Sequence, residues 1–293
     1  MKDFPLPVRM VGAGSQPGED EELQYLAMPR GMNTFRMPLV PERADAAALA
    51  DACDVLAAFR ALLDAWDPAG VPHGPGLDLA GVATPVLDII NQMLGEGEVS
   101  IQLDGMRKFR VQESVFTGLW RVCALDDDGR LARDWLEAGM LPGVAVEIAQ
   151  ERAAERLPRI DLPPGAMNSP ALLAEIGSQM ATRTRGAAAH VINLTLLPLT
   201  PGDHAVLEHA LPVGPVAMIS RGFGNCHVTS TGLRDVWRVQ YFNHMNTLIL
   251  NTIEVVDVPE VVLAAVEDLV DSRDRLAELV DWMSESCAEP TAS

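Results

Sequence analysis

The sequence has few aromatic residues, few cysteines and few basic residues, and it lacks long apolar runs. Aromatic residues make up 5% of the 293 residues. Four cysteines lie far apart and form no C-x-x-C pair, at Cys53, Cys123, Cys226 and Cys287. This spacing matches neither a disulfide framework nor a recognisable zinc motif. No apolar run approaches the roughly 20 residues that span a bilayer, and the opening residues MKDFPLPVRM lack the apolar centre of a signal peptide. We therefore expect a soluble cytoplasmic protein.

Acidic residues dominate the charged positions. The chain has 41 Asp and Glu residues against 22 Lys and Arg residues, which gives a formal net charge of −19. This charge repels phosphate backbones and anionic lipid, so we expect neither nucleic acid nor a membrane as a partner. It suits a basic partner. Apolar residues make up 48% of the chain, which is enough to form a real core.

Residues 1–40 differ from the rest of the chain. Proline recurs there and would break any long helix or central strand. An acidic run occupies residues 19–22, and several methionines are interspersed. We predict an extended arm over residues 1–40. It either packs along its own domain or contacts a partner through its flexible methionine side chains.

Hydrophobic periodicity predicts a series of helices and short strands. We expect helices over 45–66 and 170–180, and helices that begin at Thr84, Thr200 and Pro259. We expect a loop over 67–81 and a linker over 157–168, because both are rich in proline or glycine. The remaining apolar runs predict strands at 99–103, 109–111, 119–125, 190–199, 216–220, 226–229, 236–242 and 248–256.

The second half of the chain repeats the first with an offset of 117 residues. Without gaps, residues 94–146 share 12 identities with residues 211–263, where ordinary composition gives roughly 3. The triplet from Trp120 to Val122 matches the triplet from Trp237 to Val239. The sequence therefore predicts two copies of one unit, each a helix followed by an antiparallel meander.

The fold class follows from the short connections between the predicted strands. A parallel pair needs a crossover that such loops cannot hold. We therefore predict an α+β fold made of two related helix-plus-antiparallel-sheet units, with residues 41–156 as the first and residues 169–293 as the second. We expect a pseudo-twofold relation between the units and a groove between them that suits an extended peptide.

The most conspicuous string is RGFGNCH, residues 221–227, between two predicted strands. Its G-x-G precedes a strand rather than a helix, so it is not a dinucleotide fingerprint. Cys226 beside His227 raises the alternative of a thiolate or metal site. Adjacent strand residues face opposite sides of a sheet, however, so both side chains cannot easily reach one ion. We assign no metal site and no cofactor.

Two matched arginines are the other candidates for a binding role. Trp120 and Trp237 are expected to anchor the two cores, so Arg121 and Arg238 point to the other face, where they could line the contact surface. No G-x-S-x-G, H-E-x-x-H, P-loop or Rossmann pattern occurs, and nothing indicates an enzyme. The candidate binding residues are thus Arg121, Arg221, Phe223, Asn225 and Arg238.

Several long strings resemble the HupH/HyaF/HoxQ family of hydrogenase expression proteins. They are VGAGSQP at 11–17, MPR at 28–30, HVINLTLLPLTPGDH at 190–204, SRGFGNCHVTST at 220–231, DVWRVQYFN at 235–243 and NTLILNTIEVVDVP at 246–259. The resemblance covers nearly the whole chain. It implies a maturation factor for an uptake [NiFe]-hydrogenase, without a known catalytic residue set or cofactor.

The resemblance also implies a partner. Members like HoxQ are regarded as chaperones of the iron–sulfur small subunit, whose precursor carries a twin-arginine signal peptide and must stay unexported until assembly. We therefore expect a chaperone that binds this precursor, with other hydrogenase accessory proteins as further candidate partners. The alternative from another class is a metal, iron–sulfur or redox maturation factor that uses Cys226 and His227.

Overall fold

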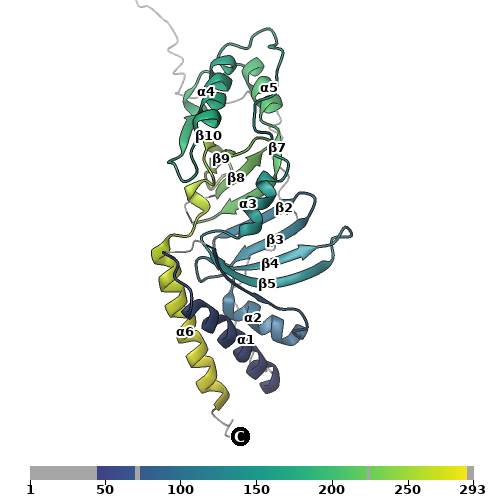
Figure 1. Ribbon diagram of the computed structural model, residues 1–293, viewed down its shortest axis with the longest axis vertical. Helices are drawn as coiled ribbons and strands as arrows, with labels where there is room; N and C mark the ends of the chain where they lie inside the picture. The colour runs from purple at the N-terminus through teal and green to yellow at the C-terminus, as the bar shows by residue number, and fades with distance from the viewer. Residues whose placement is uncertain (1–44, 70–72, 223–224, 289–293) are drawn as a thin grey trace, which may run out of the picture.

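The protein folds around one antiparallel sheet of ten strands, flanked by helices (Figure 1). The computed structural model describes residues 45–69, 73–222 and 225–288. The predicted arm over residues 1–40 lies outside these residues. The predicted α+β class with two related helix-plus-sheet units is confirmed.

The first unit contains three helices and five strands. In chain order they are α1 (Ala46–Asp64), β1 (His73–Asp78), α2 (Thr84–Leu94), β2 (Val99–Asp104), β3 (Lys108–Glu113), β4 (Leu119–Leu125), β5 (Leu131–Gly139) and α3 (Gly143–Gln150).

The second unit repeats this order, with the 3₁₀ turn η2 in the place of α3, a further 3₁₀ turn η1 after its first strand, and one additional helix, α6. It comprises α4 (Ser169–Thr182), β6 (His190–Asn193), η1 (Leu194–Leu196), α5 (Pro201–Ala210), β7 (Val213–Ser220), β8 (Asn225–Thr231), β9 (Val236–Phe242), β10 (Leu248–Val255), η2 (Glu260–Val262) and α6 (Val266–Ala288).

The two five-stranded halves join edge to edge into a continuous sheet. The strand order is β1-β5-β4-β3-β2-β7-β8-β9-β10-β6, and every neighbouring pair is antiparallel. At the junction Val99 pairs with Ser220 and Leu103 pairs with Val216. Because β2 and β7 are equivalent strands running in opposite directions, the strand order is consistent with a pseudo-twofold axis through this pair.

The duplication extends to individual hydrogen bonds. The indole Nε1 of Trp120 donates to the carbonyl of Gly139 at 2.9 Å, and that of Trp237 donates to the carbonyl of Val256 at 3.1 Å. The donors differ by 117 residues, and so do the acceptors. A buried carbonyl left without a partner costs free energy, so these bonds give each unit the same anchor.

The tight turns of the two units also correspond. Gly118 has a φ of 78° and its equivalent Asp235 has a φ of 57°, while Gly129 at 77° corresponds to Asn246 at 57°. Asp and Asn tolerate this left-handed conformation better than most residues with a Cβ. The second unit therefore keeps the backbone conformation of both turns, although Asp235 and Asn246 stand in the place of the glycines.

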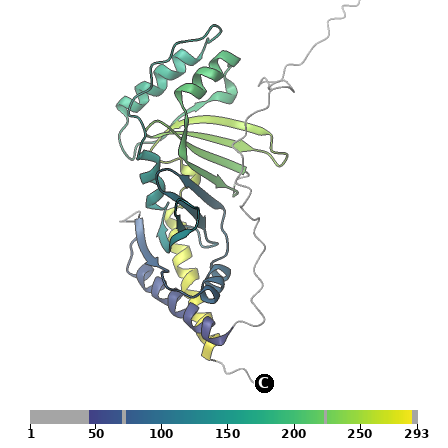
Figure 2. The ribbon, with the colours of Figure 1, turned by 90° about the vertical axis from the view of Figure 1, so that its right-hand side faces the viewer.

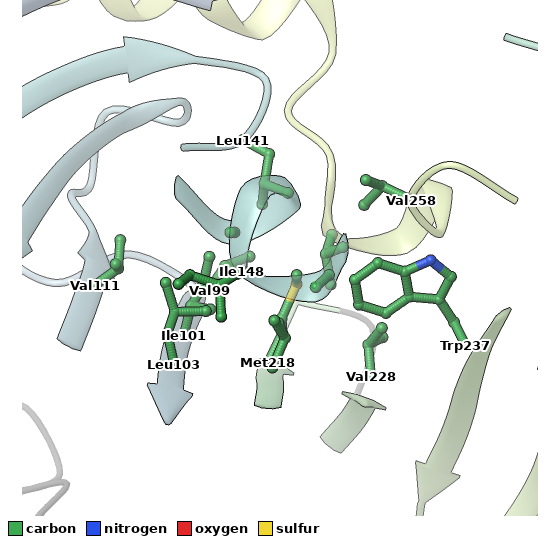
Figure 3. Packing of buried hydrophobic residues seen from close by; sticks show 14 of the residues in the cluster. Val99, Ile101, Leu103, Val111, Leu141, Ile148, Met218, Val228, Trp237 and Val258 are labelled. Carbon is green, nitrogen blue, oxygen red and sulfur yellow. The ribbon is translucent and has the colours of Figure 1, made fainter. Parts of the chain in front are cut away.

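One face of the central strands forms a core that both units share. Figure 3 shows side chains of β2 and α3, such as Ile101 and Ile148, beside Met218 of β7 and Val228 of β8, with Trp237 at the far side. All five side chains are buried. The apolar core therefore crosses the junction of the units instead of stopping at it.

Two further apolar clusters lie on the opposite face, one towards each end of the sheet. One packs α1, α2 and α6 onto the first unit, and the other packs α4 and α5 onto the second (Figures 1 and 2). Helix α6 is the last element of the second unit in sequence but packs against α1 of the first unit. Arg60 of α1 forms an ion pair with Asp281 of α6 at 2.5 Å, and Leu276 and Val280 are buried in the same cluster.

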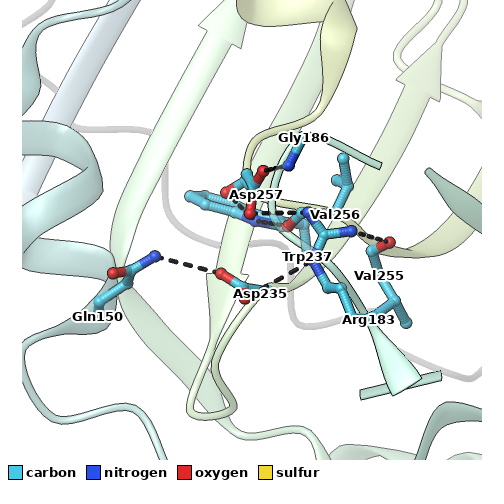
Figure 4. A network of polar contacts seen from close by, with 8 residues as sticks. All are labelled: Gln150, Arg183, Gly186, Asp235, Trp237, Val255, Val256 and Asp257. Atoms are coloured by element: carbon cyan, nitrogen blue, oxygen red, sulfur yellow. Dashed lines mark hydrogen bonds and ion pairs between the residues drawn. The ribbon is translucent and has the colours of Figure 1, made fainter. Parts of the chain in front are cut away.

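A buried arginine fixes the loop that follows α4 (Figure 4). Arg183 contacts the carboxylates of Asp235 at 3.6 Å and Asp257 at 2.8 Å, and it donates to the carbonyl of Val255. Gln150 at the end of α3 donates to Asp235 at 3.2 Å, so the network reaches the first unit. Asp235 thus forms an ion pair with an arginine, and the pair ties loops of both units together.

Some predicted element bounds are wrong in instructive ways. The segment 67–81 contains β1, a strand of sequence HGPGLD that pairs with β5. Helix α2 does begin at Thr84, as predicted, and Ala83 occupies the N-cap position without a side-chain hydrogen bond. The apolar run 190–199 is a strand only to residue 193 and then forms η1, because its side chains pack against α4 and α5. Pro259 precedes the short turn η2, and the final helix begins only at Val266.

Candidate binding face of the sheet

The face of the central strands opposite the shared core is mostly polar. Side chains alternate along each strand, so the register places two rows across the sheet. Running from β5 to β10, the first row is Leu136, Arg121, Gln112, Ser100, Ile219, His227, Gln240 and Asn251. The second row is Asp134, Cys123, Arg110, Gln102, Ala217, Thr229, Arg238 and Ile253. We call these two rows the polar face.

The two predicted arginines lie on this face, at its opposite ends. Arg121 is on β4 and Arg238 on β9, and the four strands between them make five inter-strand spacings. At about 4.8 Å per strand spacing, the separation across the sheet is about 24 Å. Helices of the first unit cover the sheet beyond Arg121, and α4 and α5 cover it beyond Arg238. The span between them is long enough for an extended peptide of several residues.

Arg121 has a dedicated carboxylate. Its Nε donates to Oδ1 of Asp134 at 3.0 Å, and its Nη2 donates to Oδ2 at 2.5 Å. This is the bidentate geometry that makes arginine–carboxylate pairs strong. Burial alone would lower the pKa of Arg121, but the pair with Asp134 raises it. Arg121 is therefore neutralised within its own unit.

Arg238 has no such partner among the residues that the structure describes. No hydrogen bond and no carboxylate within ion-pair distance is found for its guanidinium in that part of the chain, although the charge of Glu208 on α5 acts on it from farther away. Burial lowers the pKa of Arg238, and Glu208 offsets part of this effect. The guanidinium still carries its charge at neutral pH, because arginine side chains do not lose their proton in proteins.

The remaining predicted binding residues lie near one hairpin. Asn225 is exposed at the start of β8 and shares the polar-face side of that strand with His227. Arg221 is exposed at the end of β7, and its backbone N–H donates to the carbonyl of Glu98 in the first unit. Phe223 lies outside the described residues. The structure therefore places Arg121, Asn225 and Arg238 on one face and Arg221 at the tip of the hairpin beside it.

Cys226 and His227 point to opposite faces of β8. Cys226 is fully buried in the shared core, where burial raises the pKa of its thiol to about 11 despite a hydrogen bond with Tyr241. His227 lies on the polar face, 4.8 Å from the ring of Phe242 between centroids, and burial lowers its pKa. Within the described ranges, no three His, Cys, Asp or Glu side chains gather as a metal site would require.

Sequence reasoning missed the two residues that distinguish the arginines. Asp134 on β5 and Asn251 on β10 are equivalent positions, 117 residues apart. Each lies on the strand next to its arginine, two residues before the residue that pairs with the arginine. The repeat alignment already matched these positions, so reading the substitution of a carboxylate by an amide would have exposed the difference. The identical positions of the repeat do not by themselves show this difference.

The comparison with protein families identifies the chain. The model of the HupH hydrogenase expression protein, C-terminal conserved region, matches twice, over residues 49–161 and 166–283. The chain belongs to the HupH family. The two matches coincide with the repeated strand orders of the structure, so the family region itself is the duplicated unit.

Relatives cover nearly the full length of this HupH-family chain. Hydrogenase expression/formation protein HoxQ of Cupriavidus necator is 42% identical over 97% of this chain and 99% of its own. Hydrogenase expression/formation protein HupH of Rhodobacter capsulatus is 41% identical over 96% and 98%. Hydrogenase-1 operon protein HyaF of Escherichia coli is 33% identical over 96% and 98%. A role in hydrogenase maturation follows from these relatives.

The structure adds one observation about membranes. Among the helices of the described residues, none combines the length and the apolar character that crossing a bilayer requires. The longest, α6, has acidic residues in its first turn and charged residues along its length.

Proposed function

We propose that this HupH-family chain is a cytoplasmic, non-catalytic chaperone of the iron–sulfur small subunit of an uptake [NiFe]-hydrogenase. It holds the precursor of that subunit before assembly and export. The near full-length similarity to proteins named for hydrogenase expression and formation supports the pathway. The specific client rests on the resemblance and on the physical character of the surface.

The polar face is the observation that carries the proposal. It spans both units, it is framed by helices at two ends, and most of its side chains are polar. The partly or fully exposed ones are mainly amides and cations that can exchange hydrogen bonds with a polypeptide, among them Arg110, Gln112 and Gln240. Such a surface binds by many modest contacts rather than by one deep pocket. A face of this kind suits a factor that holds a chain and releases it unchanged.

The charge of the protein supports a basic client segment. With a net charge of −19, long-range attraction would raise the association rate with a basic signal segment and would weaken as salt screens it. We expect precursor association to slow as ionic strength rises from about 0.05 to about 0.5 M, because the Debye length falls below about 5 Å over that range.

Co-expression and affinity purification test this function. The tagged chain is co-expressed with the small-subunit precursor and the large subunit, and the bound proteins are identified by mass spectrometry. We expect recovery of the precursor. A precursor whose two signal arginines are changed to glutamine serves as the matched control and should be recovered less at low salt. Recovery of the large subunit alone, without the precursor, would refute the proposal.

A further inference from the structure

The two units differ in the partner that they provide for a half-buried arginine at the matched position. In the first unit Asp134 neutralises Arg121 through two hydrogen bonds. In the second unit the position equivalent to Asp134 is Asn251, which carries no charge. The backbone register around both pairs is the same, since Arg121 and Arg238 each occupy the same place relative to the neighbouring strand. The second unit therefore keeps the cation and lacks the strand carboxylate.

The amide at this position is itself without a partner. The Oδ1 of Asn251 is buried and accepts no hydrogen bond from the described residues. The backbone N–H of Asn251 is used, because it donates to the hydroxyl of Thr195 at 2.7 Å. A buried polar group without a partner is unusual in a folded protein and costs free energy. A guanidinium without an ion-pair partner in the described chain and the side-chain amide of Asn251 thus lie on neighbouring strands of one face.

The helix above the strands supplies only a distant carboxylate. Glu208 on α5 is exposed and acts on Arg238 through its charge without forming an ion pair. The equivalent position on α2 of the first unit is Asn91, so the carboxylate has changed place between the units. An exposed glutamate can move away without a large loss, because solvent-exposed charge interactions are weak.

We propose that Arg238 is a carboxylate-binding residue for the client polypeptide, with the Nδ2 amide group of Asn251 beside it as a second donor. An aspartate or glutamate of the client takes the role that Asp134 has in the first unit, as the carboxylate that the arginine binds. This inference deepens the chaperone function proposed above and rests on it. In the first unit the arginine pairs with Asp134 of the same chain. In the second unit the arginine pairs with a carboxylate of the client.

A carboxylate borne on a polypeptide suits this place better than a free small anion. A free anion must approach a molecule with a net charge of −19 and gains only the contacts of one group. A client held along the polar face brings its carboxylate at a high effective concentration, so one further ion pair adds to contacts already made. The acidic run at residues 19–22 of this chain has the same chemistry and is the competitor that the test must separate.

The exchange of Asn251 for aspartate tests the premise without any client. N251D should recreate the pair of the first unit and raise the melting temperature of the isolated protein. D134N is the matched variant in the first unit and should lower it. If N251D leaves the melting temperature unchanged or lowers it, Arg238 already has an internal partner, such as the run at residues 19–22, and the proposal is overturned.

Client capture tests the proposal itself. N251D and R238Q should each weaken precursor binding about tenfold or more, the effect of losing one charged hydrogen-bonded contact, while E208Q should retain or slightly strengthen it. D134N removes the internal partner of Arg121 and leaves an arginine beside an amide, as in the second unit, so it should bind at least as tightly as the wild type. Equal capture by wild type and N251D would overturn the carboxylate site and leave the chaperone function standing.

A defined probe separates failure of the site from failure of the function. If the wild type captures no precursor, the chaperone proposal fails. Binding of a short labelled oligoglutamate peptide with blocked ends is then compared, by fluorescence anisotropy, with binding of an oligoglutamine peptide of the same length. Preference for the glutamate peptide that N251D abolishes supports the site, and equal binding of the two peptides overturns it.

Discussion

The two units of the sheet share an apolar and backbone framework and differ in their buried polar groups. Both have the tryptophan anchor, and both have a hydroxyl turn in which Ser114 or Thr231 bonds the backbone two residues on. The charged positions have diverged, as Asp134 and Asn251 show. Apolar packing tolerates few changes of volume, whereas a polar group can be exchanged once its partner changes too. The duplicated framework has therefore kept its shape while its chemistry has differentiated.

A second divergence concerns how the helix before each meander is attached. In the first unit Val86 of α2 is buried in an apolar cluster. Its equivalent, Asp203 of α5, is fully buried and accepts hydrogen bonds from the backbone N–H groups of residues 167–169 and from Ser169 and Thr200. One helix is thus held by apolar contact and the other by a carboxylate that also closes the capping box of Thr200.

Replacing Asp203 should have the largest effect on stability. We expect Asp203→Ala to lower the free energy of unfolding by about 4 kcal/mol, because several buried donors lose their acceptor at once. Val86→Ala, the matched change in the first unit, should cost about 2 kcal/mol, the loss of two buried methyl groups and a small cavity. Urea denaturation of both variants measures the difference.

The same pair gives a prediction about pH. Burial alone would raise the pKa of Asp203, but the hydrogen bonds from Ser169 and Thr200 lower it well below its ordinary value. A carboxyl whose pKa is lower in the folded state stabilises the fold above its unfolded pKa of about 3.9, and this stabilisation is lost as the pH falls. The difference between wild type and Asp203→Ala should therefore shrink as the pH falls from about 5 to about 2. Val86→Ala should show no such change, and a constant difference for Asp203→Ala would contradict the hydrogen-bonded carboxylate.

The tight turn before the third strand of each meander should give the next largest effect. A Cβ added at Gly118 would lie 2.0 Å from Cδ2 of Leu269 in α6, and the φ of 78° is unfavourable for alanine. We expect Gly118→Ala to cost about 2–4 kcal/mol from strain and overpacking. The double variant with Leu269→Ala should lose less than the sum of the single changes, measured by thermal denaturation. Full additivity would show that α6 does not press on this turn.

The equivalent turn of the second unit serves as the comparison. Asp235 already carries a Cβ there, with Gln150 and Arg183 around its carboxylate. Asp235→Asn keeps a residue that tolerates positive φ and should cost about 1 kcal/mol from a weakened ion pair. A loss as large as that of Gly118→Ala would mean that this charge, and not only the backbone, defines the turn.

The sequence predicts the parts of this fold that depend on local pattern. Apolar runs located strands such as β4 and β9, and the helix start predicted at Thr200 corresponds to the N-cap of α5. Strand β1 was missed because His73–Asp78 is polar and rich in glycine, and it is a strand only through backbone pairing with β5. The strand propensities of its residues therefore do not predict this edge strand.

Long-range placement was beyond the sequence. Nothing in the composition of α6 indicates that it packs on α1 of the other unit, because an amphipathic helix fits any apolar surface of suitable shape. The candidate site was predictable in part, since the offset of 117 residues paired Arg121 with Arg238. Its asymmetry required the register, which showed that Asp134 and Asn251 stand beside these arginines.

The closest test of equivalence concerns the two tryptophans. Trp120→Phe and Trp237→Phe each remove one indole donor and leave a buried carbonyl, that of Gly139 or Val256, without its bond. Each should cost about 1–2 kcal/mol. The side chains are on β4 and β9, about 24 Å apart across the sheet, so the double variant should lose the sum of both within about 0.5 kcal/mol. A markedly larger loss at one tryptophan, in urea denaturation, would show that the units share a framework in shape but not in energy. A loss in the double variant well beyond the sum would show instead that the shared core couples the two anchors.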